Sequence, residues 1–377
     1  MWRIGVATLS LSACTATSEQ VILAPEPMAP TQRAMAADPA HEWKVSSLAE
    51  HDIPQTSIDE MIGKLDRGAF PGITSVLLVH KNELVLERYF EGSEREDIQN
   101  TRSASKVITS ALVGIALDRG ELESVDQKVL PMFPEYEETV ANEDLQKRSI
   151  TVAHLLSMNS GVQGNEDAMY PTNDWVGFYF DQPLVAEPGT RFSYATSGVV
   201  VLGSVVTRAS DLRIPDYANK YLFEPLGIRS YKWPISNSRG SQGLAMTGGG
   251  LHLRPRDMAK IGQLYLDGGV WKGRRILSQA WVKRSTTKHA TSDLYGEDYG
   301  YLWRMLERES SAGKVRSFEA WGNGGQFIMV FPKLDLVAVF TGTNYGRMPE
   351  MEQPFRLIEQ FILSAFSSST AGSPRDE

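Results

Sequence analysis

Cysteine is almost absent from this chain: Cys14 is the only one among 377 residues. The rest of the sequence therefore cannot form a disulfide framework or a cysteine-ligated metal site. Long basic runs are missing as well, and the net charge is −8, so a surface that neutralises nucleic-acid phosphates is not expected. The apolar stretch at residues 4–11 is too short to cross a bilayer as a helix, because such a helix needs about 20 residues.

Several catalytic and binding motifs are also missing. The six histidines show neither a His-Glu-x-x-His motif nor a close pair with metal-ligand spacing, so no metal is expected. His154 and His252 are interpreted as structural rather than catalytic, because of the segments in which they lie (150–162 and 248–277). No Gly-x-Ser-x-Gly occurs, which argues against the nucleophile elbow of α/β-hydrolases. The glycines at 248–250 are not followed by Lys-Ser or Lys-Thr, so a phosphate-binding loop is not expected either.

The N-terminus has the pattern of an exported protein. A short apolar region follows Arg3, and the sequence Leu-Ser-Ala-Cys at 11–14 resembles the lipoprotein box of bacteria. We expect a signal peptide at 1–13, a lipid on Cys14 and a flexible tether at 14–52, since residues 15–40 are rich in Ala, Pro, Thr and Gln. The protein would then be anchored by lipid in the cell envelope, on the periplasmic or extracytoplasmic face. The alternative is a buried segment with an incidental cysteine.

The remaining composition, with 42% hydrophobic and 22% charged residues, is typical of a globular protein. Apolar residues of strand type at 74–80 and 83–90 flank Lys81-Asn82 and predict a hairpin. A second hairpin is predicted from 327–331 and 336–340. Together they predict one sheet assembled from distant parts of the chain.

Helical patterns surround these strands. Helices are predicted at 57–66, after Ser103 as far as Gly120, and at 354–366, and the region from about 130 to 285 is mainly helical in pattern. The sequence therefore predicts an α/β (α+β) domain at 53–368 with an inserted helical region, followed by a disordered tail at 369–377.

Ser103 and Lys106 are the first candidates for chemistry. Residues three apart share one face of a helix, so the Ser103 hydroxyl and the Lys106 amine are expected to lie together. A serine becomes nucleophilic when an adjacent base takes its proton, and burial lowers the pKa of a lysine toward a useful range. The plain alternative is a helix-capping serine beside a solvated lysine.

The same spacing occurs at Ser285–Lys288 and Ser311–Lys314, so the pattern alone is weak. Only Ser103 precedes an apolar helix that could bury its lysine. Ser285 lies in a charged, polar stretch and Ser311 in a small-residue turn.

Longer segments strengthen this interpretation. Residues 103–122 (SASKVITSALVGIALDRGEL), 150–162, 187–206 (EPGTRFSYATSGVVVLGSVV), 248–277 and 321–342 (WGNGGQFIMVFPKLDLVAVFTG) occur in a recognisable order. Over roughly 55–365 the chain resembles the β-lactamase-like serine hydrolases, which include class C β-lactamases, D-Ala-D-Ala carboxypeptidases, family VIII esterases and 6-aminohexanoate-dimer hydrolases. The resemblance implies the β-lactamase/transpeptidase-like fold, an antiparallel sheet flanked by helices plus an all-helical region.

The resemblance also implies a proton-shuttling tyrosine in a Tyr-x-Asn motif. The matching position is Tyr194, and Thr196 replaces the asparagine. A literal Tyr-x-Asn begins at Tyr217, but it lies in an ordinary amphipathic pattern, and the flank EPGTRFS favours Tyr194. Which of Lys106 and Tyr194 deprotonates Ser103 is left open by the sequence.

A third motif of the family, Lys-Thr-Gly or His-x-Gly, is absent. The corresponding stretch is Gly322-Asn323-Gly324-Gly325-Gln326, expected on the edge of the strand that runs into 327–331. By resemblance, Asn323, Gly324 and Gly325 line the substrate site, and the backbone N–H groups of Ser103 and Gln326 form the oxyanion hole. Trp175 and Trp321 are further candidates for the substrate pocket, although aromatic residues more often belong to the core. Without the motif's lysine, a substrate carboxylate lacks its expected partner, which favours less anionic esters or amides.

The sequence therefore predicts a hydrolase that cleaves an ester or amide bond through an acyl-enzyme on Ser103, with no cofactor. Its partners would be a small-molecule ester, amide or β-lactam substrate and, through the lipid, a membrane. The alternatives are a β-lactamase or D-Ala-D-Ala carboxypeptidase, and an inactive lipid-anchored binding protein of the same fold.

Overall fold

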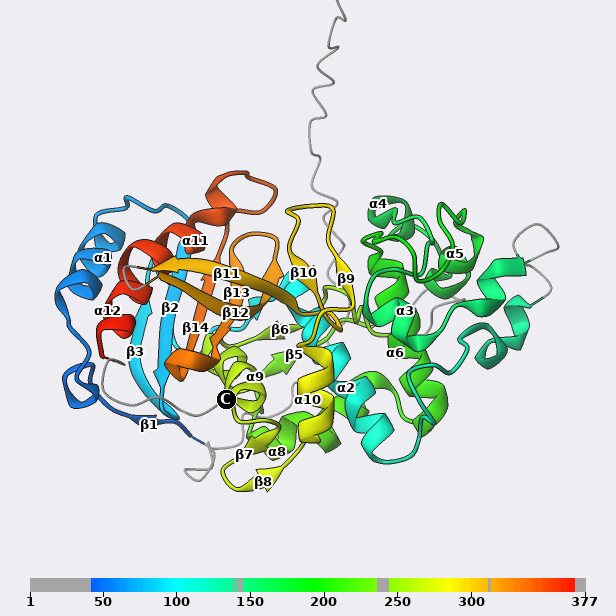
Figure 1. The fold of residues 1–377 in the computed structure, drawn as a ribbon, viewed down its shortest axis with the longest axis horizontal. Helices are drawn as coiled ribbons and strands as arrows, with labels where there is room; N and C mark the ends of the chain where they lie inside the picture. The colour runs from blue at the N-terminus through cyan, green and yellow to red at the C-terminus, as the bar shows by residue number, and fades with distance from the viewer. Residues whose placement is uncertain (1–41, 138–139, 141–144, 236–243, 311–312, 370–377) are drawn as a thin grey trace, which may run out of the picture. The chain divides into compact units, whose positions relative to one another are not determined.

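Two apolar hairpins from opposite ends of the sequence meet at the centre of the main sheet (Figure 1). The structure is a computed structural model, and it describes residues 42–369 apart from 138–139, 141–144, 236–243 and 311–312. The N-terminal hairpin turns at Lys81 and Asn82, which both have positive φ, as a two-residue turn that matches the strand twist requires. The prediction of a sheet assembled from distant segments is confirmed.

Nine strands of the described residues form this sheet, in the order β1-β3-β2-β14-β13-β12-β11-β10-β9. Its strands are β1 (Lys44–Val45), β2 (Ile73–His80), β3 (Glu83–Tyr89), β9 (Ala290–Thr291), β10 (Asp298–Tyr299), β11 (Arg304–Ser310), β12 (Gly313–Gly322), β13 (Gln326–Phe331) and β14 (Leu336–Gly342). The short strands β4 (Gln99–Asn100), β5 (Tyr231–Lys232) and β6 (His252–Leu253) form a second sheet, and β7 (Val270–Trp271) pairs with β8 (Arg274–Arg275). In the main sheet, β1 runs parallel to β3 and the other pairs are antiparallel. The expected antiparallel sheet is therefore mixed at one edge.

Helices cover both faces of this sheet and form the region beside it. They are α1 (Thr56–Asp66), α2 (Lys106–Asp118), α3 (Val152–Leu156), α4 (Glu166–Met169), α5 (Trp175–Asp181), α6 (Thr196–Ser210), α7 (Ile214–Ala218), α8 (Glu224–Leu226), α9 (Pro255–Leu266), α10 (Gln279–Ser285), α11 (Gln353–Leu357) and α12 (Leu363–Ser369). The expected helical region at 130–285 holds α3 to α10, together with the short strands β5 to β8.

The core has two layers, because side chains along each strand point alternately to the two faces of the sheet. Leu77 and Val79 face the layer that contains α2, α6 and α9, whereas Val76 and Leu78 face the layer that contains α1 and α12. Successive side chains of a strand point to opposite faces, so a continuous apolar run is buried on both sides. In Figure 1, α1 and α12 lie together on one side of the sheet.

The folded domain begins earlier than the predicted boundary at residue 53. Trp43 and Leu48 are buried, and β1 adds to the sheet beside β3. These apolar residues hold residues 43–52 against the domain, so the expectation of a tether through 52 is wrong for this part. Cys14, the signal peptide and most of the tether lie outside the described residues, as do residues 370–377 of the tail. None of the described helices combines the length and apolar character that a membrane crossing requires.

A buried histidine at the end of β2, His80, makes stability depend on pH. His80 is 2% exposed, and its Nδ1 lies 3.0 Å from Nδ1 of His51. Burial, with the charges of Lys81 and His51, lowers the pKa of His80 from 6.5 to about 4. Below pH 6.5 the unfolded chain therefore binds a proton that the folded protein does not accept until about pH 4.

We therefore expect stability to fall as the pH drops from 6.5 to 4. The His80 contribution is about 3 kcal/mol over this window, at roughly 1.4 kcal/mol for each pKa unit. Urea unfolding of the wild type and of His80→Leu at several pH values measures it. The variant should lose this part of the pH dependence, and an unchanged slope would contradict the assignment.

Candidate active site

The turn before α2 presents Ser103. Arg102–Ser105 form a 3₁₀ turn that leads directly into the helix. Arg102 has φ of +49°, a conformation that costs a residue with a side chain about 1–3 kcal/mol. Two hydrogen bonds from neighbouring side chains stabilise this backbone conformation. Asn100 Oδ1 accepts the Arg102 N–H at 2.9 Å, and Ser105 Oγ donates to the Arg102 carbonyl at 2.8 Å. Ser103 is half-buried at this turn.

Lys106 is the buried neighbour of that serine. Its side chain is 2% exposed, and its Nζ lies 3.0 Å from Ser103 Oγ. The same nitrogen lies 3.2 Å from Thr196 Oγ1 and donates to the carbonyl of Gly248. The three groups around the amine are thus two hydroxyls and a carbonyl. The spacing of three residues places the hydroxyl and the amine together, as the sequence predicts.

Tyr194 contacts the lysine through the face of its ring. Lys106 Nζ lies 4.9 Å from the ring centroid, within the usual range of a cation–π contact. The guanidinium of Arg304 is also close to Tyr194. Burial lowers the pKa of Arg304, and the electrostatic effect of the nearby Tyr194 and Tyr295 opposes this shift. Tyr194 therefore has Lys106 and Arg304 in its neighbourhood, although the two cations come from distant segments.

The competing motifs do not form such a cluster. Ser285 donates to the carbonyl of Val282, and Lys288 is half-exposed and pairs with Asp298. Ser311 lies outside the described residues. Tyr217, the tyrosine of the literal Tyr-x-Asn, is buried and donates to Glu121.

Gly322 allows the C-terminal end of β12 to lie against the turn that carries Ser103. A Cβ at Gly322 would lie 2.3 Å from the Thr101 carbonyl oxygen and 3.1 Å from the Ala104 nitrogen, a separation that only glycine permits. Gly322 ends β12 and pairs with Gln326 at the start of β13. The sequence prediction placed this stretch at the edge of one strand, but it forms the turn between two. The backbone that directly approaches the Ser103 turn is that of Gly322.

The other residues predicted for this stretch have partners inside the protein. Gln326 is buried and its Nε2 donates to the carbonyl of Gly342. Asn323 Oδ1 accepts the N–H of Gly346 at 2.7 Å, and a Cβ at Gly324 would meet the Tyr345 ring at 2.5 Å. Gly325 has φ of +96° and completes the turn.

The two candidate tryptophans contact the protein's own side chains. Trp321 Nε1 donates to Glu319 at 2.7 Å, and its ring packs 4.8 Å from that of Phe355 and 4.5 Å from the Arg304 guanidinium. Trp175 packs beside a small cluster of Met169, Val200 and Met246. Trp321 therefore shares Arg304 with the neighbourhood of Tyr194.

Two further side chains near the cluster escaped sequence analysis. Glu166 Oε2 accepts the hydroxyl of Thr196 at 2.8 Å, and the Arg102 guanidinium lies 4.6 Å from the centre of the Tyr345 ring. Glu166 is 30 residues from Thr196 in sequence and begins a four-residue helix. Such a short helix shows no periodic pattern, and no sequence signal could have linked the two.

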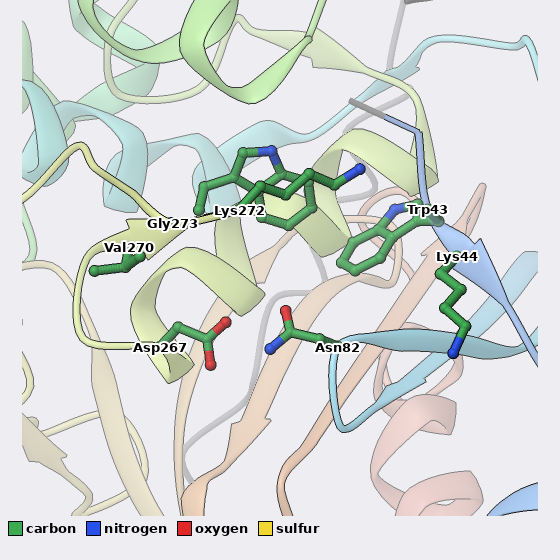
Figure 2. A pocket seen from close by; sticks show the side chains of 8 residues that line it. Trp43, Lys44, Asn82, Asp267, Val270, Lys272 and Gly273 are labelled. Carbon is green, nitrogen blue, oxygen red and sulfur yellow. The ribbon is translucent and has the colours of Figure 1, made fainter. Parts of the chain in front are cut away.

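The cavity drawn in Figure 2 does not include Ser103, Lys106 or Tyr194. It has a volume of about 480 Å³ and is lined by Trp43, Lys44, Asn82, Asp267, Val270, Trp271, Lys272 and Gly273. Asn82 lies at the β2–β3 turn, beside the β13–β14 turn, whereas Gly322 and Gln326 lie at the opposite end of these strands. The cavity is therefore separate from the Ser103 cluster. Within the described ranges, no three His, Cys, Asp or Glu side chains gather as a metal site would require.

Comparisons with known proteins identify the family. A family model described as Beta-lactamase matches residues 58–361. The 6-aminohexanoate-dimer hydrolase of Paenarthrobacter ureafaciens is 26% identical over 292 residues, which cover 70% of each chain. Penicillin-binding protein 4 of Amycolatopsis lactamdurans is 25% identical over 286 residues, which cover 67% of this chain and 73% of that protein.

The fold is similar to that of solved structures. The structure of EstCE1, a hydrolase with promiscuous acyltransferase activity, matches with a TM-score of 0.64 at 17% identity and covers 86% of this chain and 98% of that one. The expected β-lactamase/transpeptidase-like fold is confirmed. Because the family match spans well over half of the sequence, the chain belongs to the β-lactamase family, whose members are serine hydrolases.

Proposed function

We propose that this protein cleaves an ester or amide bond through a covalent acyl-enzyme on Ser103. One observation carries the proposal: the buried Lys106 amine lies 3.0 Å from the Ser103 hydroxyl. A hydroxyl and a base within hydrogen-bond reach are the basic elements of an activated nucleophile. An amine in solvent would lack this fixed position.

The proposed reaction uses Lys106 in its neutral form as the base. The amine takes the Ser103 proton as Oγ attacks the substrate carbonyl, which forms a C–O bond and a tetrahedral oxyanion. The N–H of Ser103 and a backbone N–H from the Gly322–Gln326 turn would stabilise that oxyanion, an effect worth about 3–4 kcal/mol per donor. The close approach of Gly322 to the Ser103 turn supports this placement.

Tyr194 is proposed to protonate the leaving group. Its ring lies beside Lys106, and its hydroxyl would pass the proton taken from Ser103 to the departing alcohol or amine. When the intermediate collapses, the bond from the carbonyl to the leaving group breaks and the acyl group stays on Ser103. Water then attacks the acyl-enzyme and the same groups accept its proton. The bond between the acyl carbon and Ser103 Oγ breaks, Oγ takes that proton back, and the acid is released.

The proposed substrates are esters or amides that do not depend on a carboxylate-binding lysine. The chain has no Lys-Thr-Gly motif, which supports this class over penicillins. The match to a penicillin-binding protein keeps β-lactams as the second candidate.

A covalent probe tests the proposal directly. A fluorophosphonate should label the wild-type protein at Ser103, located by peptide mass, and should leave Ser103→Ala unlabelled. Fluorescent penicillin in a parallel reaction distinguishes the second candidate, because a stable adduct favours a penicillin-binding activity. An unlabelled wild type would instead support an inactive binding protein of the same fold.

A further inference from the structure

The Thr196 hydroxyl contacts both Glu166 and Lys106. It lies at the start of α6, 2% exposed, and donates to Glu166 Oε2 at 2.8 Å. It also lies 3.2 Å from Lys106 Nζ. A hydroxyl carries one hydrogen and an ionised carboxylate can only accept. While Glu166 takes that hydrogen, Thr196 can offer Lys106 only a lone pair.

This restriction sets the direction of the amine. A neutral lysine amine has two hydrogens and one lone pair. The Gly248 carbonyl takes one hydrogen, and Thr196 takes the other because its own hydrogen is committed to Glu166. The remaining neighbour is the Ser103 hydroxyl at 3.0 Å, so the lone pair points at the proton that must be removed.

Without Glu166, the hydroxyl could turn. Thr196 could then donate its hydrogen to the lone pair of Lys106, and the amine would be occupied by the wrong hydroxyl. The two hydroxyls lie at similar distances from the amine, 3.0 and 3.2 Å. The choice between them therefore depends on what else Thr196 contacts.

Glu166 is itself held in place. Its second oxygen accepts the hydroxyl of Tyr170, which lies one turn further along. Hydrogen bonds to a carboxylate are roughly twice as strong as those between neutral groups. Tyr170 and Thr196 thus hold the two oxygens of one carboxylate, and Glu166 faces Thr196 in a fixed orientation.

We propose that Glu166 is a positioning residue for this reaction: by fixing the Thr196 hydroxyl as an acceptor, it directs the lone pair of Lys106 to Ser103. The inference rests on the proposed function and adds to it a carboxylate that acts through Thr196. Glu166 exchanges no proton with the substrate in this role.

A double-mutant cycle tests the proposal. Glu166→Ala should lower kcat for a p-nitrophenyl ester by about tenfold or more, with KM within about twofold, as expected for the loss of one orienting hydrogen bond. The same change in a Thr196→Val background should cause no further loss, because valine has no hydrogen to donate. In a Thr196→Ser background, which keeps the hydroxyl, the loss should return. Glu166→Gln should stay within about threefold of wild type, since its amide oxygen accepts the same hydrogen.

The rate of fluorophosphonate labelling is a second readout, because it reports Ser103 activation without a substrate. An equal loss in the Thr196→Val background would overturn the proposal, since Glu166 would then act independently of the hydroxyl. An unimpaired Glu166→Ala would overturn it as well. If Glu166→Ala unfolds, Glu166→Leu replaces it in the same double-mutant cycle, because leucine fills the space but accepts no hydrogen bond. Turnover that survives Ser103→Ala would instead refute the proposed function, whatever the cycle gives.

Discussion

Ser103→Ala is expected to abolish turnover of a p-nitrophenyl ester, with a loss in kcat/KM of at least about 10⁴-fold. Alanine has no hydroxyl, so no acyl-enzyme can form, and Lys106 has no proton to accept. The loss corresponds to more than about 5 kcal/mol of transition-state stabilisation, far more than a misplaced binding contact would cost. Initial rates over a range of ester concentrations measure it, and circular dichroism checks that the variant is folded.

Ser285→Ala is the matched control. Ser285 begins a Ser-x-x-Lys sequence as Ser103 does, and it is buried, but its hydroxyl donates to the Val282 carbonyl. We expect its activity to stay within about twofold of wild type, because neither its hydroxyl nor Lys288 belongs to the cluster around Lys106. If Ser103→Ala kept substantial turnover and Ser285→Ala lost it, the nucleophile would be Ser285, and the assignment of Ser103 would be wrong.

The hairpins could be predicted because three of their four strands, β2, β13 and β14, are buried on both faces. Residues 76–79 and 327–331 are continuous apolar runs followed by clear turns, and the structure has β2 and β13 there. Strands β11 and β12 were not recognised. The β11 sequence, RMLERES, buries two arginines rather than apolar residues, and the β12 sequence, GKVRSFEAWG, mixes exposed charges with buried apolar residues. The two-residue strands, such as β4 and β6, are too short to show any period at all.

The candidate site was predictable where its residues are close in sequence. Ser103 and Lys106 lie one helical turn apart, and their contact follows from that spacing. Tyr194 came only from resemblance, because nothing local indicates that its ring reaches a lysine 88 positions away. Gly322 belongs to the stretch that resemblance indicated, but its contact with Ala104 could not be predicted, because it exists only after the sheet has folded. Glu166 could not be found, since its contact with Thr196 exists only after the helical region has folded.

The fold places these distant pieces by packing rather than by local preference. Helix α6 packs against α2, which brings Thr196 to the lysine, and β12 ends at the Ser103 turn because Gly322 has no side chain. The polar cluster is therefore built from segments that are distant in sequence around one buried amine. A change in that amine should have larger consequences for catalysis than for folding.

Lys106→Met is accordingly expected to lower kcat/KM by about 10³-fold or more while the domain stays folded. Methionine is unbranched and fills the buried channel of the lysine stem, but it cannot accept the Ser103 proton. The Gly248 carbonyl and Thr196 lose a donor, which costs about 1–3 kcal/mol for each buried group left unsatisfied, and the removal of a buried amine offsets part of this. Steady-state kinetics and urea unfolding on the same preparation separate the two effects.

Two further variants distinguish a base from a fixed positive charge. Lys106→Arg carries a fixed positive charge and keeps hydrogen-bond donors, but it cannot be deprotonated near neutral pH, so we expect it to be as inactive as Lys106→Met. Lys288→Met removes the lysine of the competing motif, half-exposed and paired with Asp298, and should leave activity unchanged. If Lys106→Arg retained most of the wild-type rate, the role of the amine would be electrostatic, and the proton of Ser103 would have to go to Tyr194 instead.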